Sequence, residues 1–321
     1  MANELATQSW SNGITRRTLL RTLPALVSLP LAGGLVSRAY AQTAASFKVG
    51  QIEITVITDG VLTLPLAFAL PGRDKAEIND RLAKAGLPVD MISSQVNVAI
   101  IKTADAVILV DTGGGPDFVP SIGKLADNLD ASGIAADKIT HVVFTHAHAD
   151  HLWGVIDPLD GGSRYTNAKH VMAEAEAAFW TKPDIETEVP EIFKTMAIGS
   201  ARRLKALGDR VERVKPGAEL VSGVQLVDTG GHTPGHMSVL VRSGSEQLLI
   251  GGDVLTNPVF SFENPSWRWG PDIEPERAIA SRLKTLQMLV SEKTQILGYH
   301  LPWPGVGRVE AKDSAFRFVQ G

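Results

Sequence analysis

The sequence predicts a single α/β domain in which strands and helices alternate through two similar halves. In the first half, β-branched runs alternate with turn signals such as Thr58-Asp59-Gly60, a pattern typical of strands in one sheet. The second half repeats the order, with short strands and then an amphipathic helix. Two such halves predict either an α/β layered sandwich or a doubly wound parallel sheet, and element order alone does not separate them. No linker or low-complexity segment divides residues 42–321, which we interpret as one domain.

The first half is expected to contain three strand regions and one helix. The β-branched runs at residues 52–66 and 96–111 predict the first two strand regions. Ile122, Leu125 and Leu129 recur at helical spacing and predict a helix that buries these three side chains. The segment 141–144, His-Val-Val-Phe, predicts a short buried strand that ends directly before a cluster of histidines.

The second half is expected to contain several short strands and a longer helix. Strands are predicted near residues 225–227, 238–241 and 248–250, and a last strand ends at Tyr299. The helix opens at Pro275, because proline is favoured at the first helical position. Its inward face is expected to carry four apolar side chains: Ile279, Leu283, Leu286 and Val290.

The first 41 residues are predicted to be an export signal and not part of the fold. They contain the twin-arginine pattern Thr15-Arg16-Arg17-Thr18-Leu19-Leu20-Arg21, an apolar run to Val36 and the small-x-small site Ala39-Tyr40-Ala41. We therefore expect twin-arginine export to the periplasm, with the mature chain beginning near Gln42. The alternative is an uncleaved membrane anchor, which Pro24, Pro30 and the Gly33-Gly34 pair disfavour by interrupting the apolar run. No stable membrane insertion is expected after cleavage.

Charge and cysteine content limit the possible partners and ligands. The leader carries four of the 31 basic residues and one of the 35 acidic residues, which leaves 27 and 34 and a net charge of −7. Such a surface repels phosphodiester backbones, so no nucleic-acid partner is expected. The chain has no cysteine, which excludes disulfides, thiolate metal ligands and cysteine nucleophiles. Only nitrogen and oxygen donors remain for a metal.

The segment FTHAHADHLWG at residues 144–154 carries four potential metal ligands. In extended backbone, side chains two residues apart lie on the same side, so His146 and His148 can reach one position. Asp150 and His151 lie on the following turn and can reach a second position. Four donors at this spacing are typical of a metal site and unusual in an ordinary polar loop.

Three further candidate ligands each follow an apolar run. They are His232 in a glycine-rich turn, Asp253 after Leu248–Gly252, and His300 after Gln295–Tyr299. Strands that end at one edge of a sandwich would bring these side chains to the first cluster.

The other histidines and two aspartates are interpreted as structural or supporting. His141, His170 and His236 are expected to pack in the core or hold turns. Asp59 is expected to cap a turn. Asp111 can do the same, or can accept a hydrogen bond from a ligand imidazole, and we prefer the second role.

In order along the chain, His146-x-His148-x-Asp150-His151, His232, Asp253 and His300 resemble the complete seven-ligand set of the metallo-β-lactamase superfamily. The resemblance implies an αββα sandwich of the metallo-β-lactamase type with a two-metal site at one edge. It also implies that one ion is held by His146, His148 and His232, the second by Asp150, His151 and His300, and that Asp253 bridges them.

The chain looks most like the branch of methyl parathion hydrolase and the N-acyl homoserine lactonases. The residues similar to that branch are Val110-Asp111-Thr112-Gly113, Phe179-Trp180 and the tail from His300 to Val319. True β-lactamases of this fold generally lack an aspartate at the position of Asp253.

The resemblance also suggests a mechanism and a substrate pocket. Two neighbouring cations lower the pKa of a shared water and make a hydroxide nucleophile available at neutral pH. Asp150 is expected to orient this nucleophile and to move its proton. Trp180 and Phe118 match positions where the branch has pocket aromatics and are expected to bind substrate, with weaker candidates at Leu64, Leu66, Phe193 and Leu255. The segment FSFENPSWRW at 260–269 has two tryptophans that the branch does not usually show, so the rim of the site is expected to differ.

The leading hypothesis is therefore an exported dinuclear-metal hydrolase acting on esters, lactones or organophosphate triesters, with lactones preferred. One alternative is an iron-dependent oxidative member of the same fold, and another is a non-catalytic metal-binding protein. Imidazole and carboxylate donors suit zinc, manganese, iron and cobalt, and two zinc ions are expected. The partner is a small-molecule substrate, and the family resemblance implies a homodimer.

Overall fold

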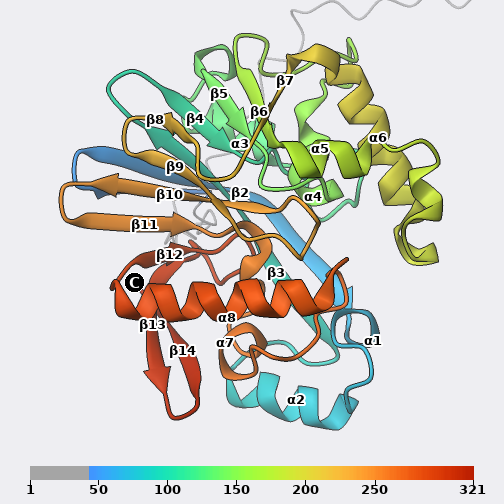
Figure 1. Ribbon diagram of the computed structural model, residues 1–321, viewed down its shortest axis with the longest axis vertical. Helices are drawn as coiled ribbons and strands as arrows, with labels where there is room; N and C mark the ends of the chain where they lie inside the picture. The colour runs from blue at the N-terminus through green and yellow to red at the C-terminus, as the bar shows by residue number, and fades with distance from the viewer. Residues whose placement is uncertain (1–42) are drawn as a thin grey trace, which may run out of the picture. The chain divides into compact units, whose positions relative to one another are not determined.

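The computed structural model describes residues 43–321, which form two packed β-sheets with helices on their outer faces (Figure 1). The export signal and its cleavage site lie outside the described residues. Each sheet has seven strands that neighbour one another in sequence order. This arrangement confirms the αββα sandwich and excludes a doubly wound parallel sheet.

The first sheet is antiparallel at its beginning and parallel from β4 to β7. Its strands are β1 (Ala44–Val49), β2 (Ile52–Pro65), β3 (Met91–Lys102), β4 (Val107–Val110), β5 (His141–Val143), β6 (Lys169–Ala173) and β7 (Val211–Val214). The expected strand at 96–111 is thus two strands, β3 and β4, joined by a turn at 103–106. Side chains along β3 alternate between the sheet's two faces: Val98 packs under the outer helices, and Ala99 faces the second sheet.

The second sheet is antiparallel except where β11 pairs with β12. Its strands are β8 (Glu219–Val221), β9 (Val224–Asp228), β10 (Met237–Ser243), β11 (Glu246–Ile250), β12 (Gln295–Leu297), β13 (Val306–Lys312) and β14 (Ala315–Gln320). Apolar side chains of both sheets form one core between them, for example Ile101 and Val143 against Val239 and Ile250. This burial of apolar surface holds the sheets together.

Helices cover the outer face of each sheet. Over the first sheet lie α3 (Leu125–Ala131), α4 (Ala149–Leu152), α5 (Glu174–Trp180) and α6 (Lys194–Leu207), and over the second lie α7 (Phe260–Glu263) and α8 (Pro275–Ser291). Two more helices, α1 (Leu66–Ala69) and α2 (Lys75–Lys84), pack with the start of β3 and with α7. Six 3₁₀ turns complete the described elements: η1 (Ala136–Lys138), η2 (Trp153–Val155), η3 (Ile185–Thr187), η4 (Glu191–Phe193), η5 (Gly208–Arg210) and η6 (Gly252–Val254). Among the described residues, no helix has both the length and the apolar character needed to cross a membrane.

Two helix predictions need correction. The helix after β4 begins at Leu125, so Ile122 is buried in the preceding turn and not on the helix. In α8 the most buried positions are Ala278, Arg282, Thr285, Leu286 and Leu289, whereas the expected inward residues Ile279, Leu283 and Val290 are only partly buried. The buried face of α8 is rotated from the predicted one because the Arg282 side chain points inward. There it donates hydrogen bonds to Asp272 and to the carbonyls of Pro265 and Trp267.

Candidate metal centre

Four loops deliver the seven predicted ligands to one edge of the sandwich. His146 and His148 follow β5, and Asp150 and His151 lie on α4 directly after them. His232, Asp253 and His300 come from the loops after β9, β11 and β12. The carboxyl ends of β9 and β11 lie at the same edge because both strands are antiparallel to β10. A hydrogen bond of 3.0 Å from the Met237 N–H to the Thr145 carbonyl ties this edge to the first sheet.

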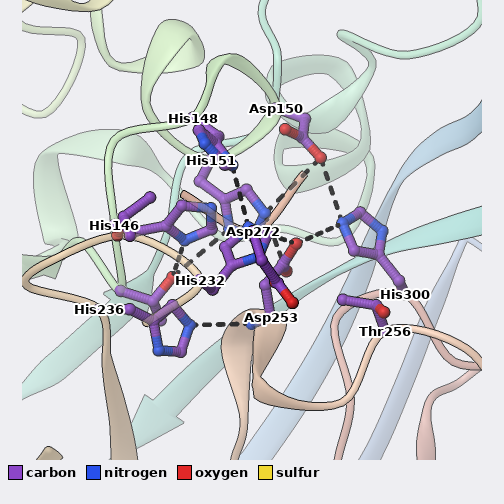
Figure 2. Close-up of polar contacts among 12 residues, drawn as sticks. His146, His148, Asp150, His151, His232, His236, Asp253, Thr256, Asp272 and His300 are labelled. Atoms are coloured by element: carbon purple, nitrogen blue, oxygen red, sulfur yellow. Dashed lines mark hydrogen bonds and ion pairs between the residues drawn. The ribbon is translucent and has the colours of Figure 1, made fainter. Parts of the chain in front are cut away.

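The first group of donors contains three histidines. The ligand atoms of His146, His148 and His232 all lie within 4.8 Å of one another. Nδ1 of His148 lies 3.0 Å from Nε2 of His232, so both nitrogens face the same point (Figure 2).

The second group contains Asp150, His151 and His300, again with all ligand atoms within 4.8 Å. Nε2 of His300 lies 3.2 Å from Asp150 Oδ2. Asp253 stands between the groups: its Oδ1 is 3.1 Å from His151 Nε2, and its Oδ2 is 3.3 Å from the Nε2 atoms of both His232 and His300 (Figure 2). Asp253 is therefore placed to serve two cations at once.

Several polar atoms of this cluster are buried without a hydrogen-bond partner among the described residues. Among them are Nε2 of His146, Nε2 of His151 and Oδ1 of Asp253, and these three residues offer ligand atoms within 4.8 Å of one another. The close contact between His151 and Asp253 does not have hydrogen-bond geometry and leaves both atoms unsatisfied. Buried polar groups without partners are rare in proteins. A pair of divalent cations fits this donor set, because imidazole and carboxylate groups are the ligands that zinc and similar metals take.

The protonation tendencies of the ligands differ between the two groups. Burial lowers the pKa of His146 and His148 well below the usual value, and neighbouring imidazoles lower the pKa further for both, so both rings are neutral at pH 7, as a metal ligand requires. Burial acts in the same direction on His300, but Asp253 and Asp150 outweigh it and raise the pKa of His300 to about 10. The same two carboxylates would also attract a cation to His300, and a bound cation would displace this proton because a ligand imidazole is neutral.

Carboxylates outside the ligand set orient two of the ligand imidazoles. Nδ1 of His151 lies 2.8 Å from Asp111 Oδ2, which confirms the preferred role of Asp111. Nδ1 of His232 lies 2.9 Å from Asp272 Oδ1, a partner that the sequence did not suggest. A ring that donates from Nδ1 presents the Nε2 lone pair to a cation, so both contacts prepare the rings for ligation.

Comparison with known proteins agrees with this geometry. The metallo-beta-lactamase superfamily matches residues 92–296, which is more than half of the chain. The chain belongs to this superfamily.

The chain is 26% identical to an N-acyl homoserine lactonase of Bacillus thuringiensis over 259 residues, covering 72% of this chain and 90% of the relative. Among solved structures, the dizinc quorum-quenching lactonase AidC superposes with a TM-score of 0.82 at 28% identity, covering 87% of this chain and 97% of AidC. The hydrolase AbOPH superposes with a TM-score of 0.80 at 24% identity, with 87% and 97% covered, and this likeness shows the fold alone. The protein is thus a dinuclear metal-dependent hydrolase of the metallo-β-lactamase superfamily, similar to lactonases.

Glu176, a buried glutamate that was not among the predicted site residues, connects the loops of the first ligand group. Oε1 of Glu176 accepts hydrogen bonds from the Ala147 N–H at 2.9 Å and the Trp180 indole at 2.6 Å. Its Oε2 accepts from the Thr233 hydroxyl at 2.7 Å and the Gly235 N–H at 2.9 Å. The run Val171–Trp180 contains two glutamates, Glu174 and Glu176, and nothing in the sequence indicates which of them is buried.

The remaining histidines have the supporting roles expected of them. Nε2 of His170 contacts the Ser163 hydroxyl at 2.8 Å, and Nδ1 of the partly buried His141 contacts the Thr140 hydroxyl at 2.9 Å. Nε2 of His236 accepts the Asp253 N–H at 3.0 Å and so holds the backbone of Asp253 in place. Asp59 accepts three backbone N–H groups at the turns before α3, which agrees with a turn-capping role.

A cavity of about 280 Å³ opens onto the ligand cluster. At its polar end lie His148, Asp150, Asp253 and His300, and its other walls are Leu62, Leu64, Pro65, Phe68, Ser94, Phe118, Ile192, Phe193, Met196, Trp269 and Pro271. Phe118 lines the cavity as expected, and so do the weaker candidates Leu64 and Phe193. Trp180, Leu66 and Leu255 do not.

Trp180 was expected to bind substrate, but it does not line the cavity. Its side chain is fully buried, and its indole N–H donates to Glu176. The ring meets His148 edge-on at 5.7 Å between centroids, so it supports the ligand from behind. The tryptophan that does line the cavity is Trp269, from the segment expected to reshape the rim.

Proposed function

We propose that this protein hydrolyses neutral lactones that carry an apolar substituent. The observation that supports the substrate class most directly is the composition of the cavity. Nearly all of its lining beyond the ligand cluster is apolar, with Ser94 as the exception, and no lysine or arginine is among the described lining residues. Such a wall favours an uncharged substrate with a hydrophobic chain, because an anionic group would lose its hydration without gaining a cationic side chain.

The comparisons support lactones over the other neutral esters. The relative from Bacillus thuringiensis is named an N-acyl homoserine lactonase. AidC was solved in complex with a product, N-hexanoyl-L-homoserine. Organophosphate triesters are also neutral, and we keep them, with simple esters, as secondary substrates of the same site.

We assign one cation to His146, His148 and His232 and the second to Asp150, His151 and His300, with Asp253 shared. When bound, the two cations would supply Lewis acidity and an ionised water as the nucleophile. Asp150 borders the cavity, and its Oδ2 faces His300, so this carboxylate is placed to orient the nucleophile and hold its proton. The Tyr299 hydroxyl donates to the Asp150 carbonyl at 2.7 Å and fixes that residue. The apolar walls bind the acyl chain and exclude water from it.

A substrate panel on the metal-loaded mature protein tests this proposal. We expect hydrolysis of N-acyl lactones to exceed that of aryl esters and phosphotriesters in kcat/KM, and to be lost in His146→Ala and Asp253→Ala. His141→Ala is the matched control, because this histidine lies outside the cluster. One iron per chain with oxygen uptake would support the oxidative alternative instead. A folded protein with two metals that leaves the whole panel intact would support the non-catalytic one.

We also propose that the protein is exported by the twin-arginine route and acts in the periplasm. The support is the sequence of the first 41 residues alone. Mass spectrometry of the periplasmic protein is expected to give an N-terminus near Gln42, and Arg16→Lys with Arg17→Lys is expected to block export. The family resemblance leads us to propose a homodimer and zinc as the metal. Light scattering and elemental analysis of the purified protein test these two points.

A further inference from the structure

Arg282 of α8 is a buried arginine that reaches into the segment 265–273. Only 3% of the residue is exposed. Its Nη1 donates to the carbonyls of Pro265 and Trp267, both at 2.9 Å, and its Nη2 donates to Asp272 Oδ2 at 3.0 Å. One guanidinium thus fixes both ends of this segment, and only a planar group with several donors can make these three contacts together.

The carboxylate that Arg282 holds also contacts a metal-centre histidine. Asp272 Oδ1 lies 2.9 Å from His232 Nδ1, and the Ile273 N–H donates to the His232 carbonyl at 2.9 Å. The Arg282 cation offsets the buried negative charge of Asp272. Asp272 is therefore held as an acceptor for His232, whose Nε2 points to the cluster (Figure 2).

The same segment forms part of the cavity wall. Trp269 and Pro271 line the cavity, and Gly270 between them packs against α1. The Gly270 N–H donates to the Ala69 carbonyl at 2.8 Å, and a Cβ at Gly270 would stand 1.6 Å from the Phe68 carbonyl oxygen. The position of the segment therefore also affects Phe68, another lining residue.

We propose that Arg282 is a positioning residue that sets two things at once: the direction of the His232 imidazole and the placement of the Trp269–Pro271 wall. Through these contacts it couples cation binding in the first ligand group to substrate binding in the cavity. The inference rests on the assignment of His232 as a ligand made above.

Metal titrations of Arg282→Met, Arg282→Lys and the control Arg203→Met test the inference. Arg203 is a buried arginine of similar surroundings, bonded to Asp117 and to the carbonyls of Trp153 and Gly199, and it touches no predicted ligand. For Arg282→Met we expect one of the two cations to bind about 10- to 100-fold more weakly, as for other residues that orient a metal ligand, with the second unchanged. For the catalysed reaction we expect KM for the lactone to rise. Arg282→Lys keeps the charge and is expected to recover part of both losses.

Two results would overturn the inference. The first is a folded Arg282→Met protein that binds both cations with wild-type affinity. The second is an equal loss of cation affinity in Arg203→Met, which would indicate a general effect of lost stability. If Arg282→Met fails to fold, Asp272→Asn gives the same test, because the amide pairs less well with both neighbours and adds no bulk.

His232→Ala separates this inference from the proposed function. If His232→Ala loses one cation but Arg282→Met and Asp272→Asn do not, the ligand assignment stands and the positioning role of Arg282 is wrong. If His232→Ala still binds two cations tightly, the ligand assignment itself is wrong.

Discussion

Replacing Glu176 by glutamine tests whether this buried carboxylate holds the loops of the metal centre. The carboxylate accepts four hydrogen bonds, two at each oxygen. Glutamine keeps one carbonyl oxygen for the Ala147 N–H and the Trp180 indole but places an NH₂ group against the other two donors. The Thr233 hydroxyl can turn and accept from this amide. The Gly235 N–H cannot, and it becomes a buried donor without a partner.

The expected loss follows from this single unsatisfied group. An unpaired buried donor costs about 1–3 kcal/mol. Burial raises the pKa of Glu176, so removing its charge also removes a desolvation cost and places the net loss toward the lower part of that range. For a domain of this size the melting temperature falls by roughly 2–4 °C per kcal/mol. Glu176→Ala leaves all four donors without their acceptor and is expected to cost more.

Calorimetry and urea unfolding of the metal-loaded protein measure these losses, and a chelator titration measures how firmly the cations are held. We expect Glu176→Gln to release metal at a lower chelator concentration, because its partners Ala147 and Thr233 are adjacent in sequence to predicted ligands. Glu174→Gln is the control, since Glu174 is an exposed residue at the start of the same helix. A Glu176→Gln protein as stable and as firmly loaded as the control would refute the reasoning.

Two further predictions concern residues away from the ligands. Burial lowers the pKa of His170 to about 4, so the unfolded chain takes up a proton that the folded one resists, and stability is lost as pH falls from 6.5 toward 4. His170→Gln keeps a partner for Ser163 but cannot titrate, so its free energy of unfolding should fall less over this range, by up to about 3 kcal/mol; parallel urea-midpoint curves would contradict this. Gly199→Ala in α6 places a Cβ 2.1 Å from the Trp153 ring, and we expect a loss of about 1–3 kcal/mol despite the better helix propensity of alanine. A Gly199→Ala melting temperature at or above that of the wild type would show that the ring moves aside freely.

The sequence predicted about half of the strands, and the seven clustered residues, because these leave local signals. It did not predict six strands, namely β1, β6, β7, β8, β13 and β14. Alternating apolar residues mark β3, and the histidines follow directly after the buried segment that ends β5. Where a strand ends at the edge of a sandwich, the next polar residues gather at that edge. His232 and His300 were therefore candidates from the sequence, and the family resemblance assigned them as ligands. The choice between one doubly wound sheet and two packed sheets needed the family resemblance, since pairing between strands distant in sequence leaves no such local pattern.

Residues that hold the predicted ligands in place without binding metal themselves were harder to predict. Arg282 and Asp272 are charged residues that the pattern places on a helix surface and in a loop, yet both are buried because each satisfies the other. The inward face of α8 was misplaced for the same reason, since a periodicity of apolar residues cannot include a buried arginine. Trp180 was expected in the cavity because the resemblance places pocket aromatics at its position, but its indole N–H donates to Glu176 in the core. Such pairings depend on tertiary contacts and not on spacing along the chain.

The distribution of the seven donors over both sheets has a consequence for how the protein withstands unfolding. His146 precedes His300 by 154 positions in a chain without cysteine. Ions held jointly by such distant donors act as removable cross-links, restricting the unfolded chain much as a disulfide would. The resistance of this fold to heat and proteases would then vary with the free metal concentration around it, and a chelating environment would weaken the whole sandwich together with its catalysis.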